Sequence, residues 1–329
     1  MSRPFYTNLP RTFDGLARTP LYTDFLYDKS KPRLCKQRNT VGLSQWKNNM
    51  KQDPPRSFSS PSGTYTQELA IIKRAIRQAS DRIRQICYEG LNIQIKPDGS
   101  PVTNADLEVD RILGDTLLEA FPDDGWLSEE RPDHPSRLQQ SRVWILDPID
   151  GTRPFTQSLP QYSISLALIE QGQPVLGVIM NPATQEYYSA VRGAGAYLNG
   201  KPLNLANLAP LSSLNGITRP TILVSPTSLP PHILEEWQPL AHCPLILGSI
   251  AYSLAMVASG QAHGVINLGR QYEWDVAAGT LIIQEAGGII LDKNQQPISL
   301  NQPHPIVNGI MTAHPPVFPI LQTLLQSLP

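Results

Sequence analysis

The chain has 329 residues, of which 40% are hydrophobic and 17% are charged, and its formal net charge at pH 7 is −1. This composition supports a buried core, excludes a wholly disordered chain and gives no indication of a nucleic-acid or membrane partner. There is no apolar run of about 18 residues, and no apolar segment of a secretory signal follows Met1. The three cysteines lie far apart, which favours a reducing compartment, so we expect a cytoplasmic protein.

Residues 1–62 differ from the rest of the chain in charge. Eleven Lys and Arg against four Asp and Glu give this segment a net charge of +7, whereas the remaining residues carry −8. The segment shows neither helical nor strand periodicity. We predict a flexible basic extension over 1–62, ahead of a folded domain over 63–329. An organelle-import peptide and an arm that docks on an acidic partner are the alternative interpretations.

Two helices are predicted at the start of the folded domain. Apolar residues recur every three or four positions from Leu69 to Ile86, which is the pattern of an amphipathic helix, and Glu89-Gly90 supplies its end. The second helix has Asn104 as its predicted N-cap and an apolar stripe from Leu107 to Leu118.

Strands follow in the next part of the chain. Short apolar runs separated by turn residues predict strands over 125–127, 143–146, 163–169, 175–180 and 186–191. Pro148 predicts that the second of these has ended, because proline lacks a backbone donor. Asn199-Gly200 predicts a hairpin turn. The same segment has the spacing of a phosphate-binding P-loop, but Pro202 stands where that motif requires Ser or Thr.

After residue 220, strands and helices alternate. We predict strands over 221–224, 245–247, 264–267 and 289–291, and helices over 231–237, 249–258 and 275–285. The sequence therefore predicts helices layered on sheets, with an α+β half over 63–215 and a more α/β half over 216–329.

A turn with two carboxylates follows one of the predicted strands. Asp147 and Asp150 are three residues apart, so both carboxylates and the Ile149 carbonyl between them can converge on one point. Hard oxygen ligands of this kind suit Mg²⁺ or Mn²⁺. Gly151 permits close approach of a ligand to the backbone, and Thr152 is placed to begin a helix whose N–H groups face an anion. Taken alone, this motif is also typical of a capped surface turn.

Three further acidic positions occur in similar contexts. Glu129-Glu130 follows a short apolar run, whereas Asp106 and Asp275 each stand at the entrance of a predicted helix. Singly, they fit a solvated loop or a favourable helix-dipole position. Gathered together they would repel, since two unit charges about 4 Å apart cost about 4 kcal/mol at an effective dielectric of 20. A shared site would therefore require cations.

The compound pattern resembles that of a known family. The lithium-sensitive, magnesium-dependent phosphomonoesterases of the inositol monophosphatase superfamily carry an acid at a helix entrance, then Glu-Glu, then Asp-Pro-Ile/Leu-Asp-Gly-Thr. They later carry Trp-Asp, with Gly-Gly eleven residues beyond it. The corresponding positions here are Asp106, Glu129-Glu130, 147–152, Trp274-Asp275 and Gly287-Gly288. The resemblance covers about residues 65–325 and implies the layered fold of the inositol monophosphatases and fructose-1,6-bisphosphatases.

The resemblance also implies roles for individual residues. Glu129, Asp147 and the Ile149 carbonyl would bind one metal ion. Asp147, Asp150 and Asp275 would bind a second, and Asp106 would lie beside a third. Glu130 would be an auxiliary acid, while Thr152 and Asp106 would orient the attacking water. The Gly151 and Thr152 N–H groups would bind the phosphate. Two or three Mg²⁺ ions are thus implied, with Mn²⁺ as an alternative.

The substrate is less well defined by the resemblance. Segments 97–103, 126–130 and 273–279 are most similar to the 3'(2'),5'-bisphosphate nucleotidases of the CysQ type. Arg153 would then face the second phosphate, although it is equally interpretable as a surface arginine. Inositol, histidinol and sugar phosphates are alternative substrates, and a metal-binding scaffold is the non-enzyme alternative. A small phosphorylated metabolite is thus the expected partner, and a homodimer is a family-level expectation.

Overall fold

The structure is a computed structural model, and it describes residues 65–205, 219–225, 229–244 and 248–326. All of these residues belong to one compact unit of the chain. The predicted extension over 1–62, the predicted boundary between 215 and 216 and the predicted strand over 245–247 lie outside the described residues. These three stay predictions.

The largest element among the described residues is a seven-stranded sheet. Its order is that of the sequence, β3 to β9, and all neighbours are antiparallel except β3 and β4. The strands are β3 (Gly125–Ser128), β4 (Arg142–Asp150), β5 (Ser163–Glu170), β6 (Gln173–Asn181), β7 (Glu186–Val191), β8 (Gly195–Leu198) and β9 (Lys201–Leu203). The β8–β9 turn has positive φ at Asn199 and Gly200, so the hairpin is confirmed and the P-loop interpretation is set aside.

Strand β4 is longer than predicted. Asp147 pairs with Ser165 and Asp150 pairs with Ser163, so β4 carries one extra residue between these two pairs. This is a β-bulge, and Pro148 lies within it, where the missing N–H breaks no ladder hydrogen bond. The prediction that the strand ends before Pro148 is therefore wrong. The two aspartates flank this bulge.

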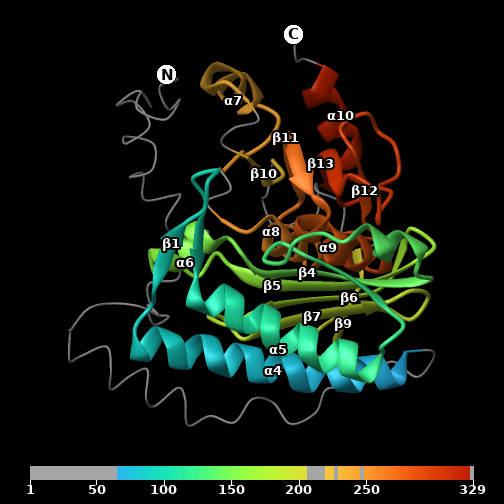
Figure 1. Cartoon of the computed structure of the whole chain (residues 1–329). Coiled ribbons are helices and arrows are strands. Elements are labelled where there is room, and N and C mark those ends of the chain that lie inside the picture. The colour runs from blue at the N-terminus through green and yellow to red at the C-terminus, as the bar shows by residue number, and fades with distance from the viewer. Residues whose placement is uncertain (1–64, 206–218, 226–228, 245–247, 327–329) are drawn as a thin grey trace, which may run out of the picture. The chain divides into compact units, whose positions relative to one another are not determined.

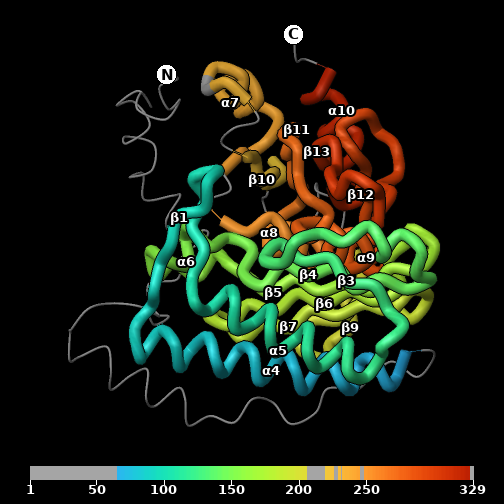
Figure 2. Tube along the Cα trace, viewed as in Figure 1, coloured from blue at the N-terminus to red at the C-terminus, as the bar shows by residue number. Residues whose placement is uncertain are grey.

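Two long helices lie side by side against one face of this sheet (Figures 1 and 2). Helix α4 (Thr66–Glu89) buries the predicted apolar stripe and ends at Gly90. Helix α5 (Asn104–Ala120) has Thr103 as its N-cap, and not Asn104 as predicted, because the Thr103 hydroxyl accepts a hydrogen bond from the Ala105 N–H at 3.1 Å. A hairpin of β1 (Ile93–Ile95) and β2 (Pro101–Thr103) joins the two helices.

Helices α8 (Ile250–Ala258) and α9 (Glu273–Glu285) cover the opposite face of the seven-stranded sheet (Figure 1). The approach of α9 is close: a Cβ placed at Gly177 of β6 would lie 2.8 Å from the Ala278 carbonyl oxygen. Any side chain at Gly177 would therefore push α9 away from the sheet. Both helices are confirmed, with α9 beginning two residues before its predicted start.

A second sheet of four strands packs beyond α8. Its order is β10-β11-β13-β12, with β10 and β11 parallel. The strands are β10 (Ile222–Val224), β11 (Gly264–Tyr272), β12 (Ile289–Leu291) and β13 (Ile306–Ala313). Helices α7 (Pro231–Trp237) and α10 (Phe318–Gln326) pack on it around Trp237, Met311 and Leu321. Strand β13 and helix α10 were not predicted.

The described elements thus form alternating layers of helix and sheet, which confirms the predicted fold class. One core fills the space between α4, α5 and the seven-stranded sheet, and another lies between the four-stranded sheet, α7 and α10. None of the helices in the described part of the chain is both long enough and apolar enough to span a bilayer.

Candidate metal and phosphate site

Three aspartates from two elements meet at the end of the seven-stranded sheet. Asp147 and Asp150 come from the bulged end of β4, and Asp275 comes from the first turn of α9. Each offers a carboxylate oxygen, and these three atoms lie within 4.8 Å of one another. Residues that are 125 positions or more apart in sequence are therefore brought to one point by the packing of α9 on the sheet.

The Asp147 carboxylate is the most deeply enclosed of the three. Its side chain is 1% exposed, and its Oδ1 atom has no hydrogen-bond partner. Burial, followed by the charges of Glu129, Asp150 and Asp275, raises the pKa of Asp147 well above its ordinary value of 3.8. A buried carboxylate oxygen without a donor is costly, so this atom is suited to bind a cation.

Asp150 is fixed by the start of helix α8. Its Oδ2 atom accepts hydrogen bonds from the Ser249 hydroxyl and the Ala251 N–H, both at 2.6 Å. Burial raises the pKa of Asp150 to about 6, although these two hydrogen bonds oppose the shift. Because both donors bind Oδ2, the other carboxylate oxygen stays available to the cluster.

Asp275 is oriented by the backbone at the entrance of α9. The Tyr272 N–H donates to Asp275 Oδ2 at 3.0 Å, and the adjacent Trp274 carbonyl accepts from the Ser165 hydroxyl at 2.9 Å. Burial, followed by the charges of Asp150 and Glu129, raises the pKa of Asp275 well above 3.8. In all three aspartates the charged form is disfavoured by burial and by like charges, which is the condition that divalent cations relieve.

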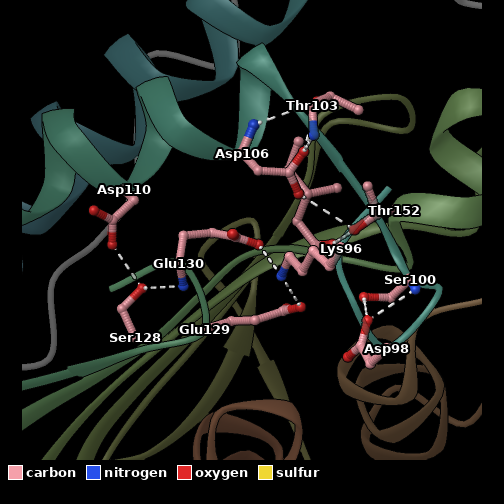
Figure 3. Close-up of polar contacts among 11 residues, drawn as sticks. Lys96, Asp98, Ser100, Thr103, Asp106, Asp110, Ser128, Glu129, Glu130 and Thr152 are labelled. Carbon is pink, nitrogen blue, oxygen red and sulfur yellow. Dashed lines mark hydrogen bonds and ion pairs between the residues drawn. The ribbon is translucent and has the colours of Figure 1, made fainter. Parts of the chain in front are cut away.

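The predicted acidic pair Glu129-Glu130 is bound by a lysine from the β1–β2 hairpin (Figure 3). Lys96 Nζ lies 2.8 Å from Glu129 Oε1 and 2.7 Å from Glu130 Oε1. Burial opposes the charge on Lys96, but the hydrogen bonds with both carboxylates raise its pKa above the ordinary value of 10.5. Burial also raises the pKa of Glu130. The ammonium group of Lys96 thus links the β1–β2 hairpin to Glu129 and Glu130.

Asp106 lies beside Thr152, at the start of helix α5 (Figure 3). Its Oδ2 atom accepts from the Thr103 N–H at 2.8 Å and the Thr103 hydroxyl at 2.5 Å, which completes a capping box at the start of α5. The Thr152 hydroxyl lies 3.3 Å from Asp106 Oδ1 and 3.0 Å from the Ile149 carbonyl. A hydroxyl has one proton, so Thr152 donates to only one of them at a time. Burial raises the pKa of Asp106 to about 7.

A cavity of about 420 Å³ opens onto the acidic cluster. Its wall includes Gly151, Thr152 and Arg153 at the start of the short helix α6 (Thr152–Thr156). Gly151 has φ 88°, and a Cβ there would lie 2.6 Å from the Gln161 carbonyl oxygen, so this position requires glycine. The remaining lining residues that bear on function are Ser100, Glu129, Asp147, Ile149, Asp150, Ser225, Asn267, Gln271, Tyr272, Trp274 and Asp275.

The predicted site residues are therefore not all equivalent. Eight of the ten line the cavity, whereas Asp106 and Glu130 are not among the lining residues and reach it only through neighbours. Three residues whose side chains donate to the acids, Lys96, Thr103 and Ser249, were not among the predicted site residues. Lys96 stands before a Pro-Asp-Gly turn and Ser249 at a helix N-cap, so each has an ordinary local explanation that hides its contact with the acids.

Alternating helix and sheet layers that gather buried carboxylates beside a glycine turn define a metal-dependent phosphatase. The chain belongs to the inositol monophosphatase family: the model of that family matches residues 65–324. The metal-binding scaffold alternative is thereby set aside, since the members of this family are phosphatases. The donor set is also hard carboxylate oxygen, as divalent cations of the Mg²⁺ type require.

Named relatives act on different esters. The chain is 37% identical to the histidinol-phosphatase of Chlorobaculum parvum over 204 residues, which cover 61% of this chain and 76% of the relative. It is 34% identical to the 3'(2'),5'-bisphosphate nucleotidase CysQ of Aggregatibacter actinomycetemcomitans over 236 residues, covering 70% and 87%.

The described fold is also similar to that of solved structures. An IMPase/NADP phosphatase complexed with Mg²⁺ and phosphate superposes with a TM-score of 0.70 at 21% identity, covering 81% of this chain and 97% of that one. At this identity the likeness supports the layered fold alone, and the relatives leave the ester undetermined.

Proposed function

We propose that the chain hydrolyses the 3'-phosphate of 3'(2'),5'-bisphosphate nucleotides by means of metal-activated water. The observation that carries the proposal is the Asp147-Asp150-Asp275 cluster, with its buried unpartnered Asp147 oxygen, in the wall of the cavity. Phosphate monoesters are among the slowest substrates to hydrolyse without a catalyst, and their negative charge opposes attack. A site of this charge therefore needs cations before an anionic ester can enter.

Two or three Mg²⁺ ions are the proposed cofactors, and Mn²⁺ has the same ligand preference. Glu129, Asp147 and the Ile149 carbonyl would hold one ion. Asp147, Asp150 and Asp275 would hold another, and the carboxylate of Asp106 would lie beside a third. When bound, such ions lower the pKa of water and neutralise the phosphoryl oxygens.

Thr152 and Asp106 are proposed to orient the attacking water. The Thr152 hydroxyl lies between the Ile149 carbonyl and Asp106. When the carbonyl is used as a ligand, the Thr152 proton is free to point at Asp106, and the hydroxyl oxygen then accepts from water. Glu130 is proposed as an auxiliary acid, which acts on the site through its shared contact with Lys96.

Gly151, Thr152 and Arg153 are proposed to bind the phosphates. Gly151 and Thr152 line the cavity at the start of α6, and their N–H groups would donate to a bound phosphate. Arg153 is exposed and lines the same wall, and a guanidinium binds phosphate through two parallel hydrogen bonds. Arg153 would add a positive charge to that of the proposed metal ions, which supports a substrate with two phosphates. The similarity to the CysQ relative, which covers 87% of that protein's length, supports the same substrate.

Histidinol phosphate is the second candidate substrate, because the histidinol-phosphatase relative is 37% identical to this chain. Inositol and sugar phosphates complete the alternatives. We further propose that the protein is cytoplasmic, with organelle import through residues 1–62 as the alternative, that it forms a homodimer and that lithium inhibits it.

The proposal is tested by measuring inorganic phosphate released by the full chain with Mg²⁺. The substrates are adenosine 3',5'-bisphosphate, inositol 1-phosphate and histidinol phosphate, each also assayed with Li⁺. We expect the highest kcat/KM for the bisphosphate and no release after chelation of the metal. A higher kcat/KM for another ester would disprove the proposed bisphosphate substrate. Phosphate release without metal would disprove the proposed metal site.

A further inference from the structure

The β11 side of the cavity carries a pair of stacked aromatic rings. The rings of Tyr272 and Trp274 are 4.5 Å apart between centroids and inclined by 8°, so they lie parallel. Both residues line the cavity. Tyr272 is nevertheless 48% exposed, which is unusual for a ring stacked on a neighbour and identifies it as one of the exposed large hydrophobic side chains. One face of the tyrosine ring is thus covered, and the ring remains accessible from the cavity.

The position of this ring relative to the acids is fixed by the backbone. The N–H of Tyr272 donates to the Asp275 carboxylate at 3.0 Å, and Trp274 is the residue directly before Asp275. A phosphate that reaches the acidic cluster therefore brings the rest of its ester within the part of the cavity that these rings line. The two rings are uncharged and add no charge to the proposed metal and phosphate site. Their location therefore suggests that they bind the rest of the substrate.

The cavity wall beyond Asp275, on the β10–β11 side of the rings, is polar and uncharged. Among the described residues of the cavity wall, every acid belongs to the carboxylate cluster and its neighbour Glu129. The β10–β11 side contributes a hydroxyl and two amides, from Ser225, Asn267 and Gln271. Such a wall suits a flat, neutral group with hydrogen-bonding edges. The carboxylates of the wall are those assigned to the proposed metal site, so beyond that site the wall offers none to the ammonium group of an amino alcohol phosphate.

We propose that Tyr272, supported from behind by Trp274, is the surface on which the base of a nucleotide substrate stacks. This inference rests on the proposed phosphatase function and assigns its substrate class: phosphate esters that carry a planar heteroaromatic base. Base stacking tolerates any base because each has a π-face, so Tyr272 selects for the presence of a base and not for its identity.

The test compares Tyr272→Leu and Tyr272→Phe with the unmodified chain on two esters, adenosine 3',5'-bisphosphate and the same ribose bisphosphate without its base. Tyr272→Leu is expected to lower kcat/KM for the nucleotide about 5- to 100-fold, the range that stacking of one base on an aromatic side chain provides. The abasic ester and the Mg²⁺ concentration for half-maximal rate should not change. Tyr272→Phe should retain the preference because it keeps the ring. Tyr88→Leu, at an exposed tyrosine of α4, is the matched control.

Two results would overturn the inference. One is an equal loss for both esters in Tyr272→Leu, which would indicate a structural role at the start of α9. The other is no change in the preference for the nucleotide, or a larger loss with histidinol phosphate.

Calorimetric binding of the nucleotide to Asp147→Asn, with and without Tyr272→Leu, separates this inference from the proposed function. Binding that depends on Tyr272 but is accompanied by no hydrolysis in the unmodified chain supports the stacking surface and disproves the reaction. Hydrolysis of the nucleotide with the same kcat/KM in Tyr272→Leu as in the unmodified chain supports the reaction and disproves the stacking surface.

Discussion

The cavity lies between two regions of different chemistry. On the side of the seven-stranded sheet, β4 and its neighbours present carboxylates, of which Asp147 is almost wholly buried and lacks a partner for one oxygen. On the side of the four-stranded sheet, the residue after β10, strand β11 and the first turn of α9 contribute hydroxyl, amide and aromatic groups. Asp275 links the two regions: it accepts from the Tyr272 N–H, and it is carried by α9, which packs on the first region.

This difference separates two tasks. The charged region is costly in the absence of cations, because its carboxylates are desolvated and repel one another. The neutral region carries no such cost. Changes in the first should therefore alter metal binding and turnover, whereas changes in the second should alter which ester is bound.

The largest effect is expected for Asp147→Asn. The change removes the charge on which the proposed cation sites depend, so kcat/KM should fall by more than about 100-fold, the upper end of the loss caused by residues that merely support a metal ligand. The same change removes a buried, repelled charge, so the melting temperature of the metal-free protein should stay the same or rise. Phosphate release and thermal unfolding in a chelator measure the two quantities.

Asp115→Asn is the matched control for this prediction, since the Asp115 side chain on α5 is 61% exposed. It should change neither quantity. If Asp147→Asn retained activity, or unfolded the metal-free protein, the charged region would not be the metal site.

Much of the fold could be predicted because its signals are local. Strands β7 and β12 and helix α7 have the predicted bounds, since each is a short periodic run between turn residues. Strand β13 was missed because Ile306–Ala313 pairs on both edges inside the four-stranded sheet, so it lacks the alternation of a half-buried strand. The extent of β4 was missed because a bulge cancels the strand-ending effect of Pro148.

The site was predictable only where its residues form motifs. The aspartates follow recognisable elements, and their spacing indicates a cluster. Lys96 meets Glu129 from 33 residues away, and Ser249 meets Asp150 from 99 residues away. Neither pairing leaves a trace in local sequence, because it depends on how the hairpin and α8 pack on the sheet. The Tyr272–Trp274 stack likewise depends on side-chain orientation at the turn into α9.

Ser249→Ala should give the second-largest effect. The Ser249 hydroxyl donates to Asp150 at 2.6 Å and accepts from the Tyr252 N–H at 2.7 Å, so it positions the carboxylate and caps α8 together. Its loss should raise the Mg²⁺ concentration for half-maximal activity about 10- to 100-fold, as expected for a partner of a metal ligand. Saturating Mg²⁺ should restore most of kcat.

Two further variants interpret the Ser249 result. Ser249→Thr keeps the hydroxyl and should retain the Mg²⁺ dependence. Ser253→Ala removes a buried hydroxyl that donates to the Ser249 carbonyl at 2.7 Å, and it should also retain the Mg²⁺ dependence. An equal shift in Ser253→Ala would mean that the effect comes from the stability of α8 and not from Asp150.

The stability of the metal-free protein should fall as pH rises. Burial raises the pKa of Asp150 to about 6 and that of Asp106 to about 7, so the folded state binds protons that the unfolded state, with a pKa of 3.8, releases. This stabilisation is complete below the unfolded pKa and is lost as pH rises through the folded values. The melting temperature in a chelator should therefore drop between about pH 5 and 8, and Mg²⁺ should restore more of it at the higher pH.

Measuring the same pH dependence in Asp147→Asn separates the contribution of the carboxylate cluster from that of the buried histidines. The buried His263 and His314, whose pKa values burial lowers, act in the opposite sense below about pH 6.5 in both proteins. The drop should be smaller in the variant. A melting temperature that rises across this range, or an effect of Mg²⁺ that does not depend on pH, would contradict the proposed cost of burying these carboxylates together.

The smallest effect is expected on the neutral side, for Gln271→Ala. Gln271 lines the cavity, and its side-chain amide donates to the Arg270 carbonyl at 2.6 Å, which leaves its carbonyl oxygen available to a substrate. Loss of one neutral hydrogen bond is worth about 0.5–1.5 kcal/mol, so KM should rise about 2- to 10-fold. Neither kcat nor the Mg²⁺ dependence should change, because the acids are untouched. Steady-state rates at several Mg²⁺ concentrations, with Gln85→Ala on α4 as the control, measure all three. A changed Mg²⁺ dependence in Gln271→Ala would show that the two regions act as one site, and the division of tasks between them would fail.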